Sequence, residues 1–189
     1  GTQSNGYFSS EAAISADGRY VAFSSDASNL VSADTNRGRD VFVHDRITGA
    51  TTRVSVAIGG TQASAVSNEP AISADGRYVA FASSSPNMVP RDTNGTSDVF
   101  VRDRVTGVTT RVSLATGGAQ ARSHSALPAI SANGRYIAFP SLASNLVAGD
   151  TNGTNDVFVR DRVAGVTTRV SLATGGTQAN GESQVPMIS

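Results

Sequence analysis

The sequence predicts an all-β protein made of three copies of one 58-residue unit, and three observations support this. First, the string AISADGRYVAF occurs at Ala13 and Ala71, and AISANGRYIAF occurs at Ala129, so that each copy starts 58 residues after the previous one. Second, no segment has apolar residues spaced for an amphipathic helix, and Gly, Ser, Thr, Asn and Asp interrupt the chain too often for one. Third, the short apolar runs are rich in aromatic and β-branched residues, which favours strands.

Each unit is predicted to contain four strands, which are clearest in the middle copy. The turn pairs Asp75-Gly76 and Thr106-Gly107 separate the first strand from the second and the third from the fourth. The strands are predicted, in order, over Pro70–Ser73, Arg77–Ala82, Asp98–Arg102 and Val108–Leu114. Long loops are predicted over Ser83–Ser97, between the second and third strands, and over Ala115–Leu127, before the next unit.

The strand pattern indicates a β-propeller built from four-stranded antiparallel blades. In RYVAF and VFV the apolar residues fall on both faces of the strand, so each sheet should be covered on both sides. Four strands at a fixed period are typical of propeller blades, whereas the coils of a β-solenoid, the alternative, are usually much shorter. The predicted organisation is a partial linker repeat over 1–12, blades over 13–70, 71–128 and 129–186, and the first strand of a next blade over 187–189.

Composition excludes several classes of function. Fifteen cationic residues balance fifteen anionic ones, and this zero net charge argues against a nucleic-acid or membrane partner. All the cations are Arg, which is the composition expected of a GC-rich bacterial genome. The chain has no Cys, so disulfides and cysteine chemistry are excluded. It starts at Gly1 without a leader, and we expect a processed mature chain or a piece of a longer one.

The repeated motifs resemble the repeat of TolB-like propellers, a WD-repeat-like family. The resemblance covers essentially the whole chain three times, although the loop between the second and third strands is lengthened. It implies a secreted or periplasmic location, because such blades occur in periplasmic assembly proteins and in substrate-gating domains of serine peptidases. The motifs that carry it in the middle unit are PAISADGRYVAF at Pro70–Phe81, DVFVRDRVTG at Asp98–Gly107 and TTRVS at Thr109–Ser113.

A recurring Asp-x-Asn-x-x-x-Asp segment predicts a calcium site in each unit. Oxygen ligands at alternate positions around a Gly-containing turn suit Ca²⁺, and Asp45, Asp103 and Asp161 are candidates for a closing carboxylate. The alternative is structural, with Asx-turns in the loop and the last Asp bound to backbone donors. The candidate ligands are Asp34, Asn36, Asp40, Asp92, Asn94, Asp98, Asp150, Asn152 and Asp156.

A second recurring group of Arg and Asp is either a polar recognition face or a solvated hairpin with weak ion pairs. Its members are Arg102, Asp103, Arg104 and Arg111, then Arg160, Asp161, Arg162 and Arg169, and nearly the same set at His44, Asp45, Arg46 and Arg53. His44 and His124 are not equivalent in the repeat, and no Gly-x-Ser-x-Gly or His-x-x-x-His motif accompanies them. We therefore predict no enzyme, no catalytic residue and no cofactor other than calcium.

Three blades cannot close a propeller, because each blade needs a neighbour on both faces. The first and last blades should therefore expose apolar surface. We expect either a fragment of a larger propeller or two copies paired into a six-bladed ring, with the terminal strand near Ile188 completing a partner's blade. The expected function is a non-catalytic scaffold or binding module for a protein or glycan. The alternatives are an accessory propeller domain of a secreted hydrolase or peptidase, and a calcium-stabilised module of an extracellular assembly.

Overall fold

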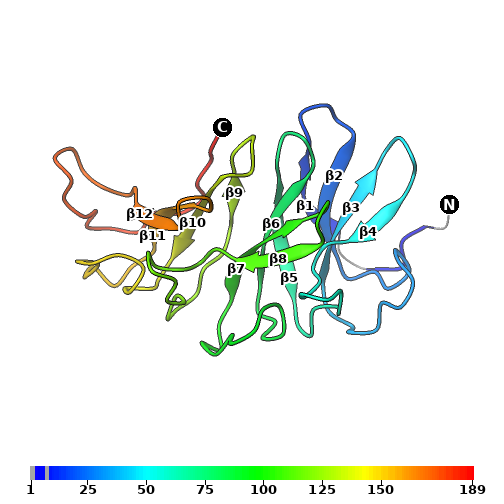
Figure 1. Ribbon diagram of the computed structural model, residues 1–189, viewed down its shortest axis with the longest axis horizontal. Coiled ribbons are helices and arrows are strands. Elements are labelled where there is room, and N and C mark those ends of the chain that lie inside the picture. Colours follow the sequence, from blue (N-terminus) through cyan, green and yellow to red (C-terminus); the bar gives the residue numbers. More distant parts are fainter. Residues whose placement is uncertain (1–2, 7–8) are drawn as a thin grey trace.

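The computed structural model describes residues 3–6 and 9–189, and it confirms the all-β prediction. Its strands form three four-stranded antiparallel sheets, each made of four consecutive strands in chain order. Figure 1 shows the three sheets side by side, in the order of the chain. In the part of the chain that is described there is no helix, and so none that is long and apolar enough to cross a membrane.

The three sheets, called blades 1 to 3, have closely similar strand bounds. Blade 1 contains β1 (Ser9–Ile14), β2 (Tyr20–Ser25), β3 (Asp40–Asp45) and β4 (Thr51–Arg53). Blade 2 contains β5 (Ser67–Ile72), β6 (Tyr78–Ser83), β7 (Asp98–Asp103) and β8 (Val108–Arg111). Blade 3 contains β9 (Ala129–Ile130), β10 (Tyr136–Ser141), β11 (Asp156–Asp161) and β12 (Val166–Arg169).

The predicted turn, Asp-Gly in blades 1 and 2 and Asn-Gly in blade 3, sets the register of each blade. Gly76 has a φ of 71°, a left-handed conformation that glycine adopts without strain, and its N–H donates to the carbonyl of Ser73. This turn leads into β6, which pairs with β7 from Tyr78 opposite Asp103 to Ser83 opposite Asp98. The predicted second and third strands are therefore confirmed.

The first and fourth strands differ slightly from the prediction. β5 begins at Ser67, before Pro70, because the pairing continues past a bulge that includes Glu69 at a φ of 55°. β8 ends at Arg111, before Leu114, because the chain then turns back and Leu114 makes an isolated bridge to Gln120.

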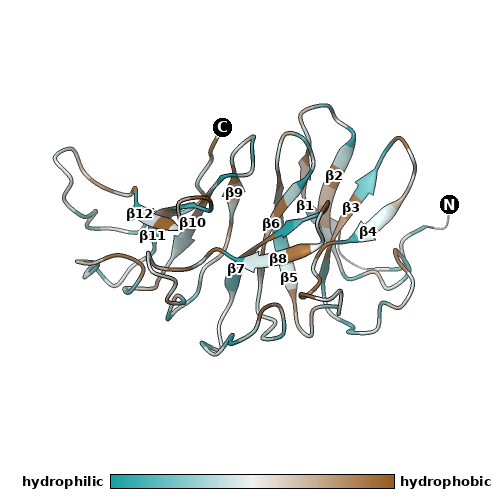
Figure 2. Cartoon of the chain, in the orientation of Figure 1, coloured by the Kyte–Doolittle hydropathy of each residue, from teal (hydrophilic) through white to brown (hydrophobic). Residues whose placement is uncertain are grey.

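The hydrophobic cores lie between neighbouring blades, as the two-sided strand pattern predicts. Figure 2 shows hydrophobic and hydrophilic residues interspersed along the strands of every sheet. Each joint between two blades brings together two kinds of face, which we call the valine face and the phenylalanine face. The valine face of blade 1 comprises Ala22, Val41, Val43, Val54 and Ala63. The phenylalanine face of blade 2 comprises Ile72, Val79, Phe81, Met88 and Phe100.

The same kind of joint connects blades 2 and 3. Here the valine face of blade 2 (Ala80, Val99, Val101, Val112 and Ala121) packs against blade 3. The phenylalanine face of blade 3 contains Ile130, Ile137, Phe139, Ala143, Leu146 and Phe158. Blade 2 therefore contributes one face to each of the two joints, blades 1 and 3 contribute one face each, and the two joints have the same design.

The predicted blade boundaries remain predictions. β5 begins within the range 13–70 that was assigned to blade 1, and residues 1, 2, 7 and 8 of the predicted linker repeat lie outside the described residues. Residues 187–189, predicted as the first strand of a next blade, pair with no strand in the described chain. Such a strand would need to pair with a second strand after residue 189. The expectation that the segment near Ile188 completes a partner's blade conflicts with β1, which already pairs with β2.

Candidate functional site

The Asp-x-Asn-x-x-x-Asp segment of each blade joins an arginine and a serine in a buried polar cluster. In blade 2, Arg111 Nη1 lies 2.9 Å from Asp92 Oδ1 and 3.0 Å from Asp98 Oδ2. The Ser113 hydroxyl donates to Asp98 Oδ1 at 2.5 Å, and Asn94 Nδ2 donates to Asp98 Oδ2 at 2.9 Å. Asp98 is fully buried at the start of β7, so this cluster fixes the long loop to the strand that follows it.

The other two blades repeat this cluster. In blade 1, Arg53 Nη1 is 3.1 Å from both Asp34 Oδ1 and Asp40 Oδ2. In blade 3, Arg169 Nη1 is 3.5 Å from Asp150 Oδ1 and 3.2 Å from Asp156 Oδ2. Asn36 and Asn152 donate to the last Asp of their segments, as Asn94 does. All nine predicted residues therefore lie in three equivalent clusters.

The donor set of this cluster does not fit Ca²⁺. Calcium requires six to eight oxygen ligands, but Arg111 places a cationic guanidinium between the two carboxylates and Asn94 turns its amide nitrogen toward Asp98. Asp103 lies at the opposite end of β7, where it binds Arg77. Over residues 3–6 and 9–189, no three His, Cys, Asp or Glu side chains are grouped to hold a metal ion. Burial raises the pKa of Asp92, as does the neighbouring Asp98. The geometry favours a structural role, in which the N–H of Thr96 donates to Asn94 Oδ1 as in an Asx-turn, but Asp98 binds the side chains of Asn94, Arg111 and Ser113 where backbone donors were expected.

The Arg and Asp residues of the recurring hairpin do not form one recognition face. Arg77 binds Asp103 through two parallel hydrogen bonds, Nε to Oδ1 at 3.0 Å and Nη2 to Oδ2 at 2.8 Å. These bonds lower the pKa of Asp103 well below its usual value. The side chain of Arg77 is 40% exposed, so this pair matches the solvated-hairpin alternative.

Arg104, in contrast, lies at the joint between two blades. Its guanidinium carbon is 4.4 Å from the ring centroid of Tyr20 in blade 1, and its Nη1 donates to the carbonyl of Gly76 at 2.6 Å. The Tyr20 ring lies directly over Gly76, since a Cβ there would be 2.2 Å from Tyr20 Cδ2. Arg162 makes the same contact with Tyr78, at 4.7 Å.

This Tyr–Gly–Arg contact was not anticipated from the sequence. By sequence the Asp-Gly pair predicts only a turn, and the repeated spacing between Gly76 and Arg104 gives no sign that a tyrosine of the preceding blade lies between them. The signal that was available is that DGRY or NGRY accompanies Arg46, Arg104 or Arg162 in every unit.

A second unanticipated contact joins the first strands of neighbouring blades. The carboxylate of Glu11 accepts the N–H of Glu69 at 2.9 Å, and the carboxylate of Glu69 accepts the N–H of Leu127 at 2.6 Å. Burial raises the pKa of Glu69. The sequence concealed this contact because Leu127 replaces the acid in blade 3, which breaks the repeat.

The two histidines lie in different parts of the fold and have different partners. His44 lies in β3 of blade 1, where Nδ1 is 2.9 Å from the hydroxyl of Thr51. His124 precedes β9 in the sequence, and its carbonyl accepts a hydrogen bond from Ser141 in blade 3. His124 also lines a pocket together with Glu69 of blade 2.

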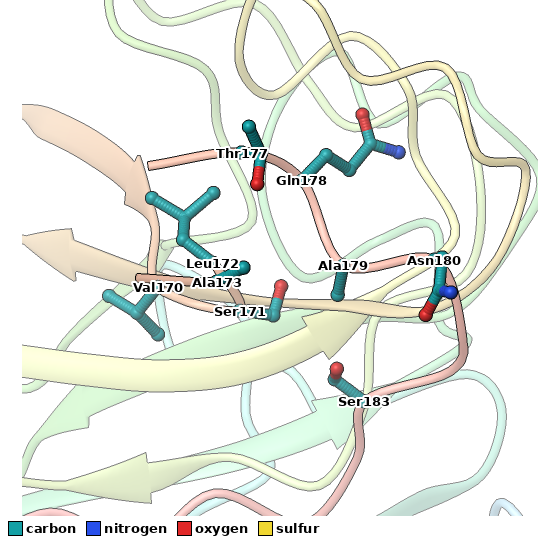
Figure 3. Close-up of a pocket in the computed structure, with 9 residues that line it drawn as sticks. All are labelled: Val170, Ser171, Leu172, Ala173, Thr177, Gln178, Ala179, Asn180 and Ser183. Carbon is teal, nitrogen blue, oxygen red and sulfur yellow. The ribbon is translucent and has the colours of Figure 1, made fainter. Parts of the chain in front are cut away.

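The outer faces of blades 1 and 3 are the surfaces that the fold leaves open. Val170 of blade 3 is 51% exposed, although its equivalents Val54 and Val112 are each 2% exposed. Ile14 of blade 1 is 58% exposed, although Ile72 and Ile130 are 9% and 8% exposed. A pocket lies on the blade 3 side, and Figure 3 shows that Val170 to Ala173, Thr177 to Asn180 and Ser183 line it. These outer faces are the candidate functional surface.

Comparison with known proteins shows the fold. No protein-family model and no curated protein sequence matches the chain. TolB from Acinetobacter baumannii is similar in structure, with a TM-score of 0.52 and 17% identity over 94% of this chain and 35% of that one. A putative TolB from Agrobacterium tumefaciens gives 0.55 and 17%, over 87% of this chain and 50% of that one.

A protease domain shows the same fold. The β-propeller domain of the Trilobed protease from Pyrococcus furiosus, described as having an open velcro topology, gives a TM-score of 0.53 and 13% identity. The match covers 88% of this chain and 43% of that one. The chain therefore spans half or less of the length of these three proteins, and its fold is that of a TolB-like β-propeller.

Proposed function

We propose that this chain, whose fold is that of a TolB-like β-propeller, is a non-catalytic scaffold or binding module whose ring is completed by a second copy or by further blades. The observation that carries the proposal is the exposure of Val170 and Ile14, whose equivalents in the other blades are buried wherever a neighbouring blade covers them. Apolar surface of this kind marks an association site. We propose a secreted or periplasmic location for the module.

The ligand we propose is a protein or a glycan bound by the long loops between the second and third strands. The three loops occupy equivalent positions because the blades share one topology. Each loop is held to its strand by a buried cluster such as Arg111, Asp92 and Asp98, which gives a repeated and rigid surface. A neutral chain offers no excess of cations for nucleic acid or an anionic membrane.

The oligomeric mass of the purified chain tests ring completion. We expect the mass of two copies in native mass spectrometry and in light scattering at micromolar concentration. A well-folded monomer would exclude closure by a second copy. Binding to arrays of oligosaccharides and peptides tests the ligand proposal separately, and substitution of the exposed Arg91 in the blade 2 loop should weaken that binding.

An accessory propeller domain of a secreted hydrolase or peptidase is the second candidate. It is supported by similarity of fold to the propeller domain of the Trilobed protease, and similarity of fold does not show function. A hydrolase signature in the same reading frame, outside these residues, would favour this candidate.

A further inference from the structure

We infer that the valine face of blade 3 binds the phenylalanine face of blade 1 in a second copy, through the contacts that join blades 1 and 2 and blades 2 and 3. The inference rests on the proposed completion of the ring by a second copy, and it specifies the two surfaces and their residues. The partner is identified by the chain itself, because two internal joints show which surface covers each face.

The valine face of blade 3 is ready for such a partner. Val54 and Val112 are buried in the internal joints, and Val170 occupies the same position with half its surface exposed. Val99 is fully buried in blade 2, whereas its equivalent Val157 is only half-buried in blade 3. The residues are unchanged in type, so only the missing neighbour explains the exposure. Val170 to Ala173, which line one side of the pocket in Figure 3, belong to the surface that this neighbour would cover.

The phenylalanine face of blade 1 has the complementary defect. Phe81 and Phe139 are fully buried in the internal joints, whereas Phe23 at the same position is only half-buried. Ile14 is likewise exposed where Ile72 is buried. The two open faces are therefore of opposite kinds, and the internal joints show that these kinds fit each other.

Backbone polarity follows the same direction through the chain. The N–H of Ala16 donates to the carbonyl of Ala74 at 3.0 Å, and the N–H of Ala74 donates to the carbonyl of Ala132 at 3.0 Å. In the proposed joint, the N–H of Ala132 would donate in the same way to the carbonyl of the partner's Ala16. The joint therefore continues a directional series of hydrogen bonds between blades.

The Tyr–Gly–Arg contact supplies the most specific element of the joint. Tyr136 on blade 3 is the equivalent of Tyr20 and Tyr78, whose rings cover Gly76 and Gly134. On blade 1 the equivalent surface is already formed. Gly18 has the same φ of 71° as Gly76, and Arg46 Nη1 donates to the carbonyl of Gly18 at 2.7 Å.

A joint of this kind is heterologous, since two different faces meet. Two copies then share two identical joints and form a closed ring of six blades, provided that the rotation per blade closes. An unclosed rotation would instead give longer assemblies.

The amino-terminal and carboxy-terminal segments meet at this joint. Asn29 Nδ2 donates to the carbonyl of Gln3 at 2.7 Å, as Asn87 does to the carbonyl of Gln62 at 2.9 Å. Residues 3–5 of blade 1 thus occupy the place that residues 178–180 of another copy would take. In the proposed joint, residues 3–5 keep this position, because the segment that follows them is fixed to the blades: β1 pairs with β2, and Glu11 accepts the N–H of Glu69. Residues 178–189 of the other copy lie outside the joint.

Two variants of the full chain test the inference, each with a matched control. Gly18→Ala places a methyl group where the partner's Tyr136 would lie, and Gly49→Ala is its control. Gly49 has a φ of 73° and nothing within 4 Å, so the control keeps the backbone strain without touching the joint. Val170→Asp places a charge on the valine face, and Val163→Asp is its control. Val163 is 77% exposed, and its equivalents are exposed in every blade.

Sedimentation velocity and native mass spectrometry from about 1 to 100 μM give the readout. We expect two copies in the wild type and in both controls, and a dissociation constant raised at least about tenfold in Gly18→Ala and in Val170→Asp. An equimolar mixture of these two variants should regain a two-copy species, because one of its two joints is intact. Recovery on mixing distinguishes this heterologous joint from an isologous one.

Each remaining outcome has a definite meaning. A wild-type chain that stays monomeric at the highest concentration overturns both the inference and closure by a second copy. A two-copy wild type that both variants leave unchanged overturns only the inference, and the proposed ring remains. Circular dichroism monitors folding. If Val170→Asp folds poorly, Tyr136→Ala is used in its place, because it removes an aromatic ring from the same side of the joint.

Discussion

Replacement of Gly76 by alanine should destabilise the joint between blades 1 and 2 far more than an ordinary glycine substitution. Two costs apply at this position. The φ of 71° places an L-residue in the left-handed region, at a cost of about 1–2 kcal/mol. A Cβ would also lie 2.2 Å from Tyr20 Cδ2, so the ring must move, and such overpacking costs about 1–3 kcal/mol more.

Gly107 in the same blade provides the control. Its φ is 70°, but the nearest atom to a Cβ there is Arg102 Nη2 at 3.5 Å, an ordinary contact. Gly107→Ala should therefore show only the backbone cost. The expected difference between Gly76→Ala and Gly107→Ala is about 1–3 kcal/mol, or roughly 2–12 °C in melting temperature for a chain of this size.

Thermal melting and urea unfolding, followed by circular dichroism, measure this difference. A double-mutant cycle makes the test specific, since in a Tyr20→Ala background the cost of Gly76→Ala should fall to that of Gly107→Ala. Equal melting temperatures for Gly76→Ala and Gly107→Ala in the wild-type background would refute the packing of the Tyr20 ring on Gly76.

Three further changes test the polar contacts. Asp103→Asn should make the free energy of unfolding less dependent on pH in acid. The lowered pKa of Asp103 stabilises the fold above about pH 4, and this stabilisation disappears as the pH falls through the folded-state pKa. The midpoints of urea unfolding from pH 7 to pH 2 measure this dependence. Asp98→Asn should lower the free energy of unfolding by about 3–5 kcal/mol, because it weakens the buried pair with Arg111. The chelator EGTA should leave the melting temperature of the wild type unchanged, and a marked decrease with EGTA would restore the calcium prediction. Glu69→Ala should cost about 1–3 kcal/mol in urea unfolding, because the N–H of Leu127 loses its acceptor, and an unchanged midpoint would contradict that contact.

The sequence predicts the fold of this chain well because its local signals agree with one another. The Asp75-Gly76 turn and the apolar residues on both faces of β6 together require a sheet with neighbours on each side, and the structure has that arrangement. The ends of strands were less accurate. No local signal marks the bulge at Glu69 that lengthens β5, since a left-handed glutamate is stabilised by the adjacent blade.

The candidate site was predicted only in part, for a related reason. The Asp and Asn residues of the loops were correctly grouped, but spacing along the chain cannot show that Arg111 reaches back from the end of β8 to lie between two of them. Likewise, Arg104 belongs by sequence to an exposed hairpin, and only the arrangement of blades places it over Tyr20. Contacts between repeats are invisible to a reading that treats each repeat by itself.

The three blades are nearly identical in sequence, but their positions in the chain should give them different local stabilities. Blade 2 is covered on both faces, whereas blades 1 and 3 are each covered on one, so the cooperative coupling that resists local opening is greatest in the middle. In the dissociated Gly18→Ala variant, the backbone amide of Phe100 should therefore exchange with deuterium more slowly than those of Phe42 and Phe158, although all three occupy the same position in the same DVFV segment. Occupation of the outer faces by a partner would make the three rates converge.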